Sequence, residues 1–362
     1  MRNFSRRDFL NKSTLLSGAV LSFPHLATGK KTGGPVIIGE GEHQYEVDHA
    51  FAKLPEKFTW QTTHNLALDA EQNLYVMHEG NRKMRDHPSI FVFDPNGKFI
   101  RAFGSQFQGG GHGIEVRQEG SEQFLYVTAY QNIKSFAKLT LTGETVWYQR
   151  APMASGLYAE GENRSNKPEW GRNRFMPTNT AFHPSDGSIY LADGYGGHCI
   201  HRYDPDGRYL STIGKFGRGD GEFNLPHGLW VDHRDPKSPT LCVADRSNRR
   251  LQWFTLDGKH LKTLAEPFIL PANIDTHQEL LVVPDLSARI TLLDKDNQVI
   301  HLADDEQWRK QVLADRYKLR TQPDQWIDGK FLHPHDACFD VEGNLFIAEW
   351  VATGRITKLK KL

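Results

Sequence analysis

Residues 225–258 read LPHGLWVDHRDPKSPTLCVADRSNRRLQWFTLDG, and this stretch holds the pattern that decides the fold. An apolar run follows a histidine, a second run ends in an acidic turn, and a third run ends in an Asp-Gly turn. Short runs rich in apolar and β-branched residues, separated by Gly, Asp and Asn, are typical of antiparallel strands joined by tight turns. The stretch therefore predicts one small antiparallel sheet.

The same pattern returns along nearly the whole chain, in six units. They cover about 60–107, 108–153, 174–224, 225–267, 268–306 and from 331 onward. A period of roughly 40–50 residues with four strands per unit is typical of a β-propeller. The sequence thus predicts an all-β, six-bladed β-propeller. A β-sandwich is the alternative, and six repeats in phase argue against it.

The sixth unit is incomplete, because it stops after about three strands. The segment His43–Asp48 precedes unit one and belongs to no other unit, so we expect it to close blade six as the fourth strand. Closure removes the sheet edges that would otherwise pair with other chains. A single propeller over 36–362 follows, with insertions at 154–173 and 302–330. Long insertions are either functional lids or decoration.

Composition excludes several classes of protein. Lysine plus arginine and aspartate plus glutamate each number 44, so the formal net charge is zero and attracts neither nucleic acid nor an anionic membrane. No run of 18 apolar residues is present to span a bilayer. The three cysteines, Cys199, Cys242 and Cys338, do not resemble a disulfide framework. We expect a monomer that takes a small-molecule or peptide substrate.

The N-terminal segment resembles a targeting signal rather than part of the fold. Arg6 and Arg7 precede a modest apolar stretch from Leu15 to Phe23, and a cleavage point follows near Ala27 to Gly29. We interpret 1–29 as a twin-arginine-type export signal, which implies a prokaryotic source and a periplasmic or secreted protein. A basic tail before a chance apolar run is the alternative.

Histidines recur at one position of the repeat. Aligned there, the six units carry His64, His112, Thr178, His227, Ala272 and His335. The innermost strands of a propeller line its axis, so the histidines of blades two, four and six should face one point. Three imidazoles facing one point form a metal site with an open position, suited to zinc and also to copper, iron or nickel.

Two alternatives stay open at this position. The three histidines would otherwise form hydrogen bonds to the backbone near the channel. His64, from blade one, is an additional ligand, a base or a residue that lines the channel.

A resemblance to a known family adds to this interpretation. The segments Leu225–Leu229, Leu241–Arg246, Arg250–Phe254, Ala192–Tyr195 and Pro334–Asp336 closely resemble the peptidyl-α-hydroxyglycine α-amidating lyases, which are six-bladed propellers of NHL-type repeats. The resemblance spans about 60–362. It implies zinc held by His112, His227 and His335. It also implies a structural calcium held by the Asp336 carboxylate and the carbonyls of Leu66 and Ile114.

The resemblance also implies a reaction. Tyr195 falls on the family's catalytic tyrosine and Arg246 on an active-site arginine. The family splits a carbinolamide, an N–C(OH) unit, into an amide and glyoxylate. A tyrosinate whose pKa is depressed by the metal and an arginine would take the hydroxyl proton. The fork of donors on an arginine suits a substrate carboxylate.

The chain departs from the family at several positions. Glu79 stands where the family has a second arginine, and Arg82 and Arg85 follow as candidates to compensate. His333 replaces a methionine near the site, and Trp253 stands at the position of the cysteine that would pair with Cys242. We therefore expect the scaffold of the site to be kept and the substrate to differ.

Two classes of function follow. The first is an exported zinc-dependent lyase that cleaves a carbinolamide or a related hydroxy compound. The second is a non-catalytic propeller that binds protein or glycan, with a structural metal. A metal-dependent hydrolase of lactones or esters on the same ring is a further alternative, because one fold hosts unrelated functions.

Overall fold

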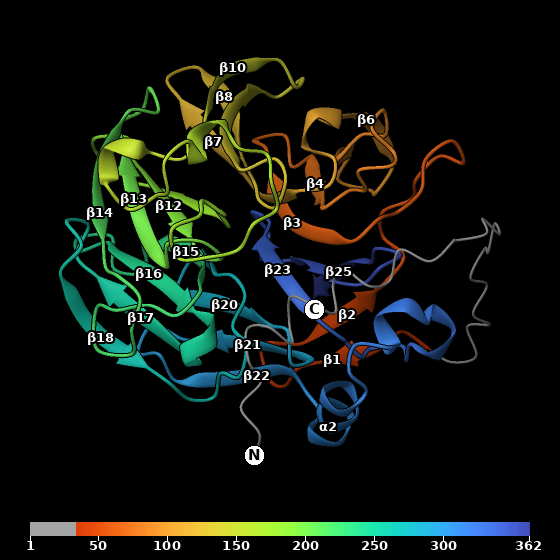
Figure 1. Cartoon of the computed structure of the whole chain (residues 1–362). Coiled ribbons are helices and arrows are strands. Elements are labelled where there is room, and N and C mark those ends of the chain that lie inside the picture. Colours follow the sequence, from red (N-terminus) through yellow and green to blue (C-terminus); the bar gives the residue numbers. More distant parts are fainter. Residues whose placement is uncertain (1–33) are drawn as a thin grey trace. The chain divides into compact units, whose positions relative to one another are not determined.

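Six antiparallel sheets surround a central axis in the computed structural model, which describes residues 34–362 (Figure 1). Residues Pro35–Leu362 form one unit, and the predicted export signal lies outside the described residues. Each sheet is one blade of a β-propeller, so the described residues have the predicted fold.

The strands of the first three blades run outward from the axis in chain order. They are β3 (Thr63–Leu68), β4 (Leu74–His78), β5 (Ile90–Phe93) and β6 (Phe99–Phe103); β7 (Gly111–Glu119), β8 (Glu122–Ala129), β9 (Ser135–Thr140) and β10 (Thr145–Gln149); and β11 (Thr180–Phe182), β12 (Ile189–Asp193), β13 (Cys199–Tyr203) and β14 (Tyr209–Ile213).

The next two blades repeat this order, and the last blade takes strands from both ends of the unit. They are β15 (Pro226–Asp232), β16 (Thr240–Asp245), β17 (Arg250–Phe254) and β18 (His260–Leu264); β19 (Asp275–His277), β20 (Leu280–Asp285), β21 (Arg289–Leu293) and β22 (Val299–Asp304); and β23 (Pro334–Phe339), β24 (Leu345–Glu349), β25 (Ile356–Lys361), β2 (Tyr45–Asp48) and β1 (Ile37–Ile38).

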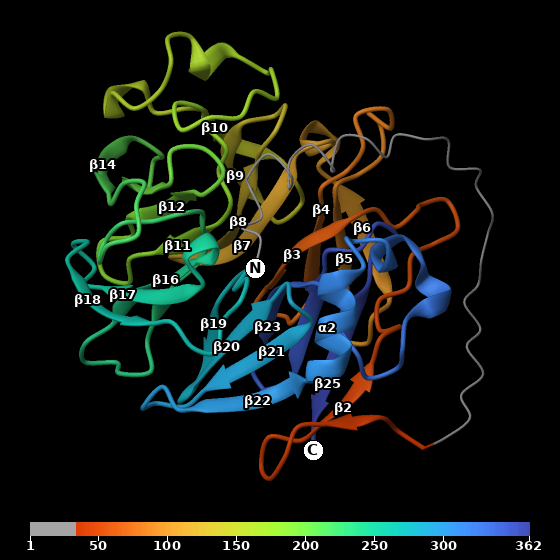
Figure 2. The ribbon, with the colours of Figure 1, turned by 60° about the horizontal axis from the view of Figure 1, so that its bottom comes forward.

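The ring closes through β2, which pairs antiparallel with β25. The register joins Tyr45 to Lys361 and Asp48 to Lys358. Figures 1 and 2 show the red β2 beside the blue β25. The predicted closing strand is therefore present. The structure adds β1, which the sequence did not predict and which makes this sheet five-stranded.

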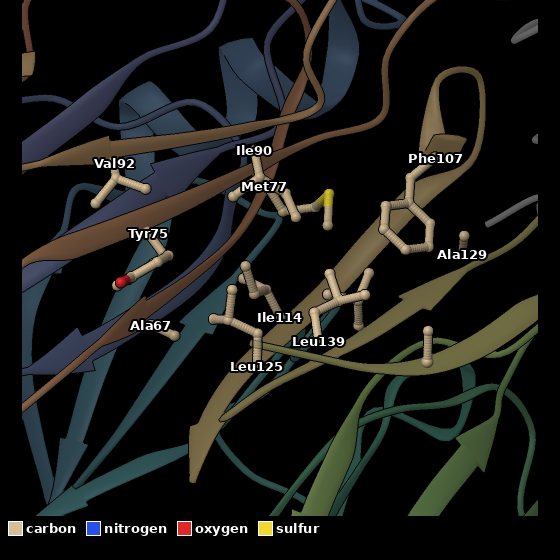
Figure 3. Close-up of a cluster of buried hydrophobic side chains, with 12 residues drawn as sticks. Ala67, Tyr75, Met77, Ile90, Val92, Phe107, Ile114, Leu125, Ala129 and Leu139 are labelled. Atoms are coloured by element: carbon tan, nitrogen blue, oxygen red, sulfur yellow. The ribbon is translucent and has the colours of Figure 1, made fainter. Parts of the chain in front are cut away.

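The hydrophobic core lies between neighbouring blades. Tyr75, Met77 and Ile90 from blade one pack against Ile114 and Leu125 from blade two (Figure 3). Every residue of β4 is buried, because one face of its sheet packs on blade two and the other on blade six. Sheets covered on both faces have continuous apolar strands rather than alternating ones. This explains the unbroken runs of the repeat.

Both insertions fold against the ring. The first contains the short 3-10 helices η2 (Met153–Ser155) and η3 (Glu162–Arg164), and the buried Glu162 carboxylate fixes it through Lys134, at 2.7 Å. The second contains α2 (Glu306–Ala314), η5 (Leu319–Thr321) and η6 (Pro323–Gln325). Asp305 caps α2 by accepting from the Trp308 amide at 2.9 Å. Two further 3-10 helices are η1 (Ser105–Phe107) and η4 (Arg246–Asn248).

Two features agree with the composition. All three cysteines are free, and Cys242 is fully buried in β16 as a small apolar residue. Among the described residues, no helix is long and apolar enough to cross a membrane.

The closing strand offers a direct test of ring stability. Tyr45 is fully buried, and its hydroxyl has no hydrogen-bond partner among the described residues. We expect Tyr45→Ala to lower the free energy of unfolding by about 3 kcal/mol, because it leaves a cavity between β2 and blade five. Tyr45→Phe keeps the volume and removes an unpaired hydroxyl, so it should be neutral or stabilising. Urea denaturation measures both variants, and equal losses would contradict a packing role for this strand.

Candidate functional site

Four histidines meet at the axis because a β-bulge turns each of them inward. In β3, β7, β15 and β23 the register with the neighbouring strand shifts at the histidine, at positions His64, His112, His227 and His335. A bulge puts two residues opposite one, bends the strand and re-aims a side chain, often beside an active site.

Three of these histidines are those predicted to hold a metal. The ring centroids of His112 and His227 lie 4.7 Å apart, those of His227 and His335 4.8 Å, and those of His112 and His335 5.1 Å. The Nε2 atoms of His112 and His227 are 3.1 Å apart. All three side chains are buried. The structure therefore brings the predicted triad together at the hub, which we define as these three histidines and His64.

The backbone of the following blade fixes the tautomer of each triad histidine. The Nδ1 atoms of His112, His227 and His335 each lie 2.7 Å from a carbonyl oxygen, of Thr178, Ala272 and His64 respectively. A carbonyl can only accept, so each Nδ1 carries the proton and donates. Each Nε2 then keeps a lone pair for a metal, which is the usual arrangement of a metal-binding histidine.

Glycine after the histidine makes this contact possible. A Cβ on Gly113 would lie 2.5 Å from the Thr178 carbonyl oxygen, and one on Gly228 would collide with Asn273 and the Ala272 carbonyl. These carbonyls are the acceptors of the His112 and His227 protons. The His-Gly pairs seen in the sequence therefore let neighbouring innermost strands approach closely.

His64 is the fourth imidazole of the hub. Its ring centroid lies 4.8 Å from that of His112 and 4.7 Å from that of His335. The possible ligand atoms of these three histidines lie within 4.8 Å of one another, so His64 is also placed to bind an ion. Its Nε2 is 3.4 Å from Glu79 Oε2 and forms no hydrogen bond with it.

Burial keeps the hub uncharged. It lowers the pKa of His112, His227 and His335 well below the ordinary value for histidine, and the Arg246 guanidinium lowers each of them further. Burial also lowers the pKa of His64, although Glu79 opposes this effect. Neutral imidazoles are the form that binds a metal.

Tyr195 and Arg246 adjoin the triad as predicted. The Tyr195 hydroxyl lies 3.0 Å from His227 Nε2 and accepts from Arg246 Nη1 at 3.2 Å. Arg246 therefore contacts Tyr195. It does not pair with Asp245, which binds Arg250 instead. Burial raises the pKa of Tyr195, and Arg246 offsets this only in part. The arginine alone does not produce the predicted tyrosinate.

The second insertion supplies an arginine that the sequence did not identify. Arg320 stacks over the Trp350 ring, with its guanidinium carbon 3.4 Å from the ring centroid. Its charge lowers the pKa of Glu79, against the effect of burial and together with His64. Arg82 and Arg85, the candidates to compensate for Glu79, are both exposed.

Aromatic rings cover the hub beside Tyr195. Tyr130 stacks on Tyr195 at 5.3 Å between centroids, and Trp170 of the first insertion meets both rings edge-on at 6.0 and 5.7 Å. His333 lies farther out, where its Nδ1 is 2.7 Å from the Leu286 carbonyl and its ring is 5.3 Å from Tyr317. The sequence located the insertions because they interrupt the repeat, but the repeat gives no information about which of their side chains approach the hub.

A polar layer lies one residue past the histidines. Asp336 Oδ2 accepts from the Leu66 amide at 2.6 Å, and Asp336 Oδ1 accepts from Asn273 Nδ2. The Ile114 amide donates to Asn65 Oδ1 at 2.9 Å. The Leu66 and Ile114 amides thus point into the channel. The carbonyl of an extended residue points to the same edge as its amide, so both carbonyls are available there.

This layer also holds buried acids. Burial raises the pKa of Asp336 to about 6 and that of Asp275 to about 7, and it also raises the pKa of Glu115 well above its ordinary value. None of the three forms an ion pair within residues 34–362. A bound cation would supply the positive counter-charge that these buried carboxylates lack.

Known proteins resemble the chain in sequence and in fold. The mouse peptidyl-glycine alpha-amidating monooxygenase is 27% identical over 252 residues, which are 61% of this chain and 24% of the mouse protein. Human NHL repeat-containing protein 3 is 28% identical over 222 residues, 59% of this chain and 57% of the human protein. The chain is an NHL-type propeller related to these proteins.

The remaining comparisons concern the fold alone. A streptogramin B lyase structure matches with a TM-score of 0.53 at 12% identity, over 89% of this chain and 99% of that one. No family model matches the chain. Because the chain spans about a quarter of the length of the amidating monooxygenases, the activity of those whole proteins does not transfer to it directly.

The neutral hub predicts a pH dependence of stability. The folded pKa of each triad histidine lies below the value near 6.5 of the unfolded chain, so the unfolded state binds more protons below that pH. The unfolding free energy of the metal-free protein should therefore fall as the pH drops below about 6.5, by up to about 1.4 kcal/mol per pH unit for each histidine. Urea titrations at several pH values should show a shallower slope for His227→Gln. Identical slopes would mean that His227 is already protonated in the fold.

Proposed function

We propose that the protein is a zinc-dependent lyase that splits a carbinolamide bearing a carboxylate into an amide and glyoxylate or a related aldehyde. The observation that carries this proposal is the triad His112, His227 and His335. Each of these residues donates its Nδ1 hydrogen to a backbone carbonyl of the next blade. The related amidating monooxygenases support the class of reaction.

The residues of the hub fit a metal ion. His112, His227 and His335 would hold it through Nε2, and His64 is placed as an additional ligand. When bound, zinc supplies a Lewis acid that lowers the pKa of a substrate hydroxyl. Nitrogen ligands from three residues leave an open position for that hydroxyl.

Tyr195 is the proposed base. Its oxygen lies within hydrogen-bond distance of both His227 Nε2 and Arg246 Nη1, so it adjoins the place where the substrate hydroxyl would lie. The phenol must first lose its proton. The Arg246 guanidinium, which donates to the Tyr195 oxygen, would stabilise the resulting phenolate.

Two arginines are suited to the substrate carboxylate. Arg246 is buried and Arg320 is half-buried, and burial lowers the pKa of each guanidinium, since neither charge is fully compensated. A carboxylate accepts two parallel hydrogen bonds from a guanidinium. Tyr130 and Trp170 would cover an apolar part of the substrate.

We also propose a calcium ion at the polar layer, bound by the Asp336 carboxylate and the carbonyls of Leu66 and Ile114. Hard oxygen ligands that include a carboxylate suit this ion. It would join blades one, two and six. The N-terminal signal supports the further proposal that the protein acts in the periplasm or after secretion.

Glyoxylate release from an N-acyl-α-hydroxyglycine tests the reaction. We expect the zinc-loaded protein to release glyoxylate, and His227→Ala to lose both bound metal and turnover. Tyr195→Phe should keep the metal and lower kcat by about 100-fold or more, because it removes the base without touching a ligand.

Tyr190→Phe is the matched control, since Tyr190 lies in β12 with its hydroxyl bonded to the Leu256 carbonyl, away from the hub. It should leave kcat unchanged. Full activity of Tyr195→Phe would remove the assigned base. Bound metal with no turnover of any carbinolamide would contradict the proposed reaction.

Arg320 makes a separate prediction about substrate binding. Arg320→Gln should raise KM for a carboxylate substrate at least about tenfold, because a charged hydrogen bond contributes about 1.5 kcal/mol or more. The same variant should have little effect on the corresponding carboxamide. An equal change in KM for both substrates would show that Arg320 only supports the fold.

A further inference from the structure

A second group of metal-binding side chains lies in blade three, away from the hub. Asp193 ends β12, and Cys199 and His201 lie in β13. The possible ligand atoms of the three residues lie within 4.8 Å of one another, and all three are buried. They share one face because residues two apart in a strand point the same way, and Cys199 is the register partner of Asp193.

The repeat shows that this cluster replaces a simpler pair. In blades four and six the acid that ends the second strand binds an arginine, as in Asp245 with Arg250 at 2.8 Å and Glu349 with Arg355. In blade five Arg289 is the register partner of Asp285. In blade three the same position holds Cys199. Asp193 thus keeps the buried acid of the repeat but lacks the cationic partner.

The spacing of the cluster fits a metal ion. Cys199 Sγ and His201 Nε2 are 3.7 Å apart. A tetrahedral zinc ion with bonds of about 2.3 Å to sulfur and about 2.0 Å to nitrogen would hold these atoms about 3.6 Å apart. His201 Nδ1 lies 2.9 Å from Thr212 Oγ1, which can accept its proton. His201 Nε2, which now contacts the Tyr158 hydroxyl, would exchange that contact for the ion.

We propose that Asp193, Cys199 and His201 form a second metal site, which takes Zn²⁺ or another divalent ion that binds thiolate. One sulfur, one nitrogen and one oxygen ligand select late divalent metals over magnesium or calcium. Binding would replace the thiol proton of Cys199, which passes to the solvent. The ion would supply the charge that arginine supplies in blades four and six.

The first insertion closes the site. Tyr158 donates to Asp193 Oδ2 at 2.6 Å and also lies against His201 Nε2. Its ring packs on Phe175. A metal here would therefore fasten the insertion that carries Trp170 and the turn from Asp193 to Tyr195. The site is structural, and it supports two residues beside the hub, Trp170 and Tyr195, without touching the substrate.

Sulfur distinguishes the two sites experimentally, because the hub has no sulfur ligand. In the zinc-loaded full-length protein, X-ray absorption at the zinc edge should show one zinc–sulfur path at about 2.3 Å. The cobalt-loaded protein should show a thiolate-to-cobalt charge-transfer band. Both measurements use the wild-type protein, so they do not depend on a variant that folds.

Variants then assign the signal. Cys199→Ser and His201→Gln should each lose the cobalt–thiolate band and one metal ion per chain, whereas His227→Ala should lose the hub ion and keep the band. Cys242→Ser is the matched control, because Cys242 is buried in blade four without a histidine partner. This variant should keep the cobalt–thiolate band and both metal ions. No zinc–sulfur path in the wild-type protein, or a band that survives Cys199→Ser, would overturn the proposal and leave a hydrogen-bonded network through Tyr158.

Discussion

The hydrogen bond from an imidazole Nδ1 to the carbonyl of the next blade is the interaction on which the hub depends. It occurs three times, from His112, His227 and His335. Each bond fixes a tautomer, aims Nε2 at the axis and ties two innermost strands together. The bulge that turns the histidine inward and the glycine that follows it in blades two and four both serve this contact.

The insertions convert this symmetric hub into an asymmetric site. The histidines repeat around the axis, but Trp170 comes from the first insertion and Arg320 from the second, so the groups around the hub do not repeat with the blades. Glu79 lies near His64 and under the influence of Arg320, where its charge would repel an anionic substrate that Arg320 attracts. The specificity of the protein therefore depends on the parts that interrupt the repeat.

The sequence was sufficient for the fold and for the triad, because both follow from periodicity. Six units in phase predict six blades. Histidines at the same position of each innermost strand should therefore all face the axis. Arg320 could not be found in this way, because it belongs to no repeat. Burial raises the pKa of Tyr195, an effect that spacing alone does not reveal, whereas the predicted lowering requires a bound metal as well as Arg246. Arg82 and Arg85 follow Glu79 in the sequence and are both exposed, so their part in the site stays a prediction.

The three imidazole–carbonyl bonds join blade two to three, four to five and six to one, so the hub divides the ring into three two-blade modules. One ion held by all three histidines would bridge the modules and act as a clamp on the whole circle. Opening any seam between modules would then require release of a ligand. Loss of metal and loss of cooperativity among blades should therefore be one event, and an ion bound at the hub would also protect the ring from local unfolding.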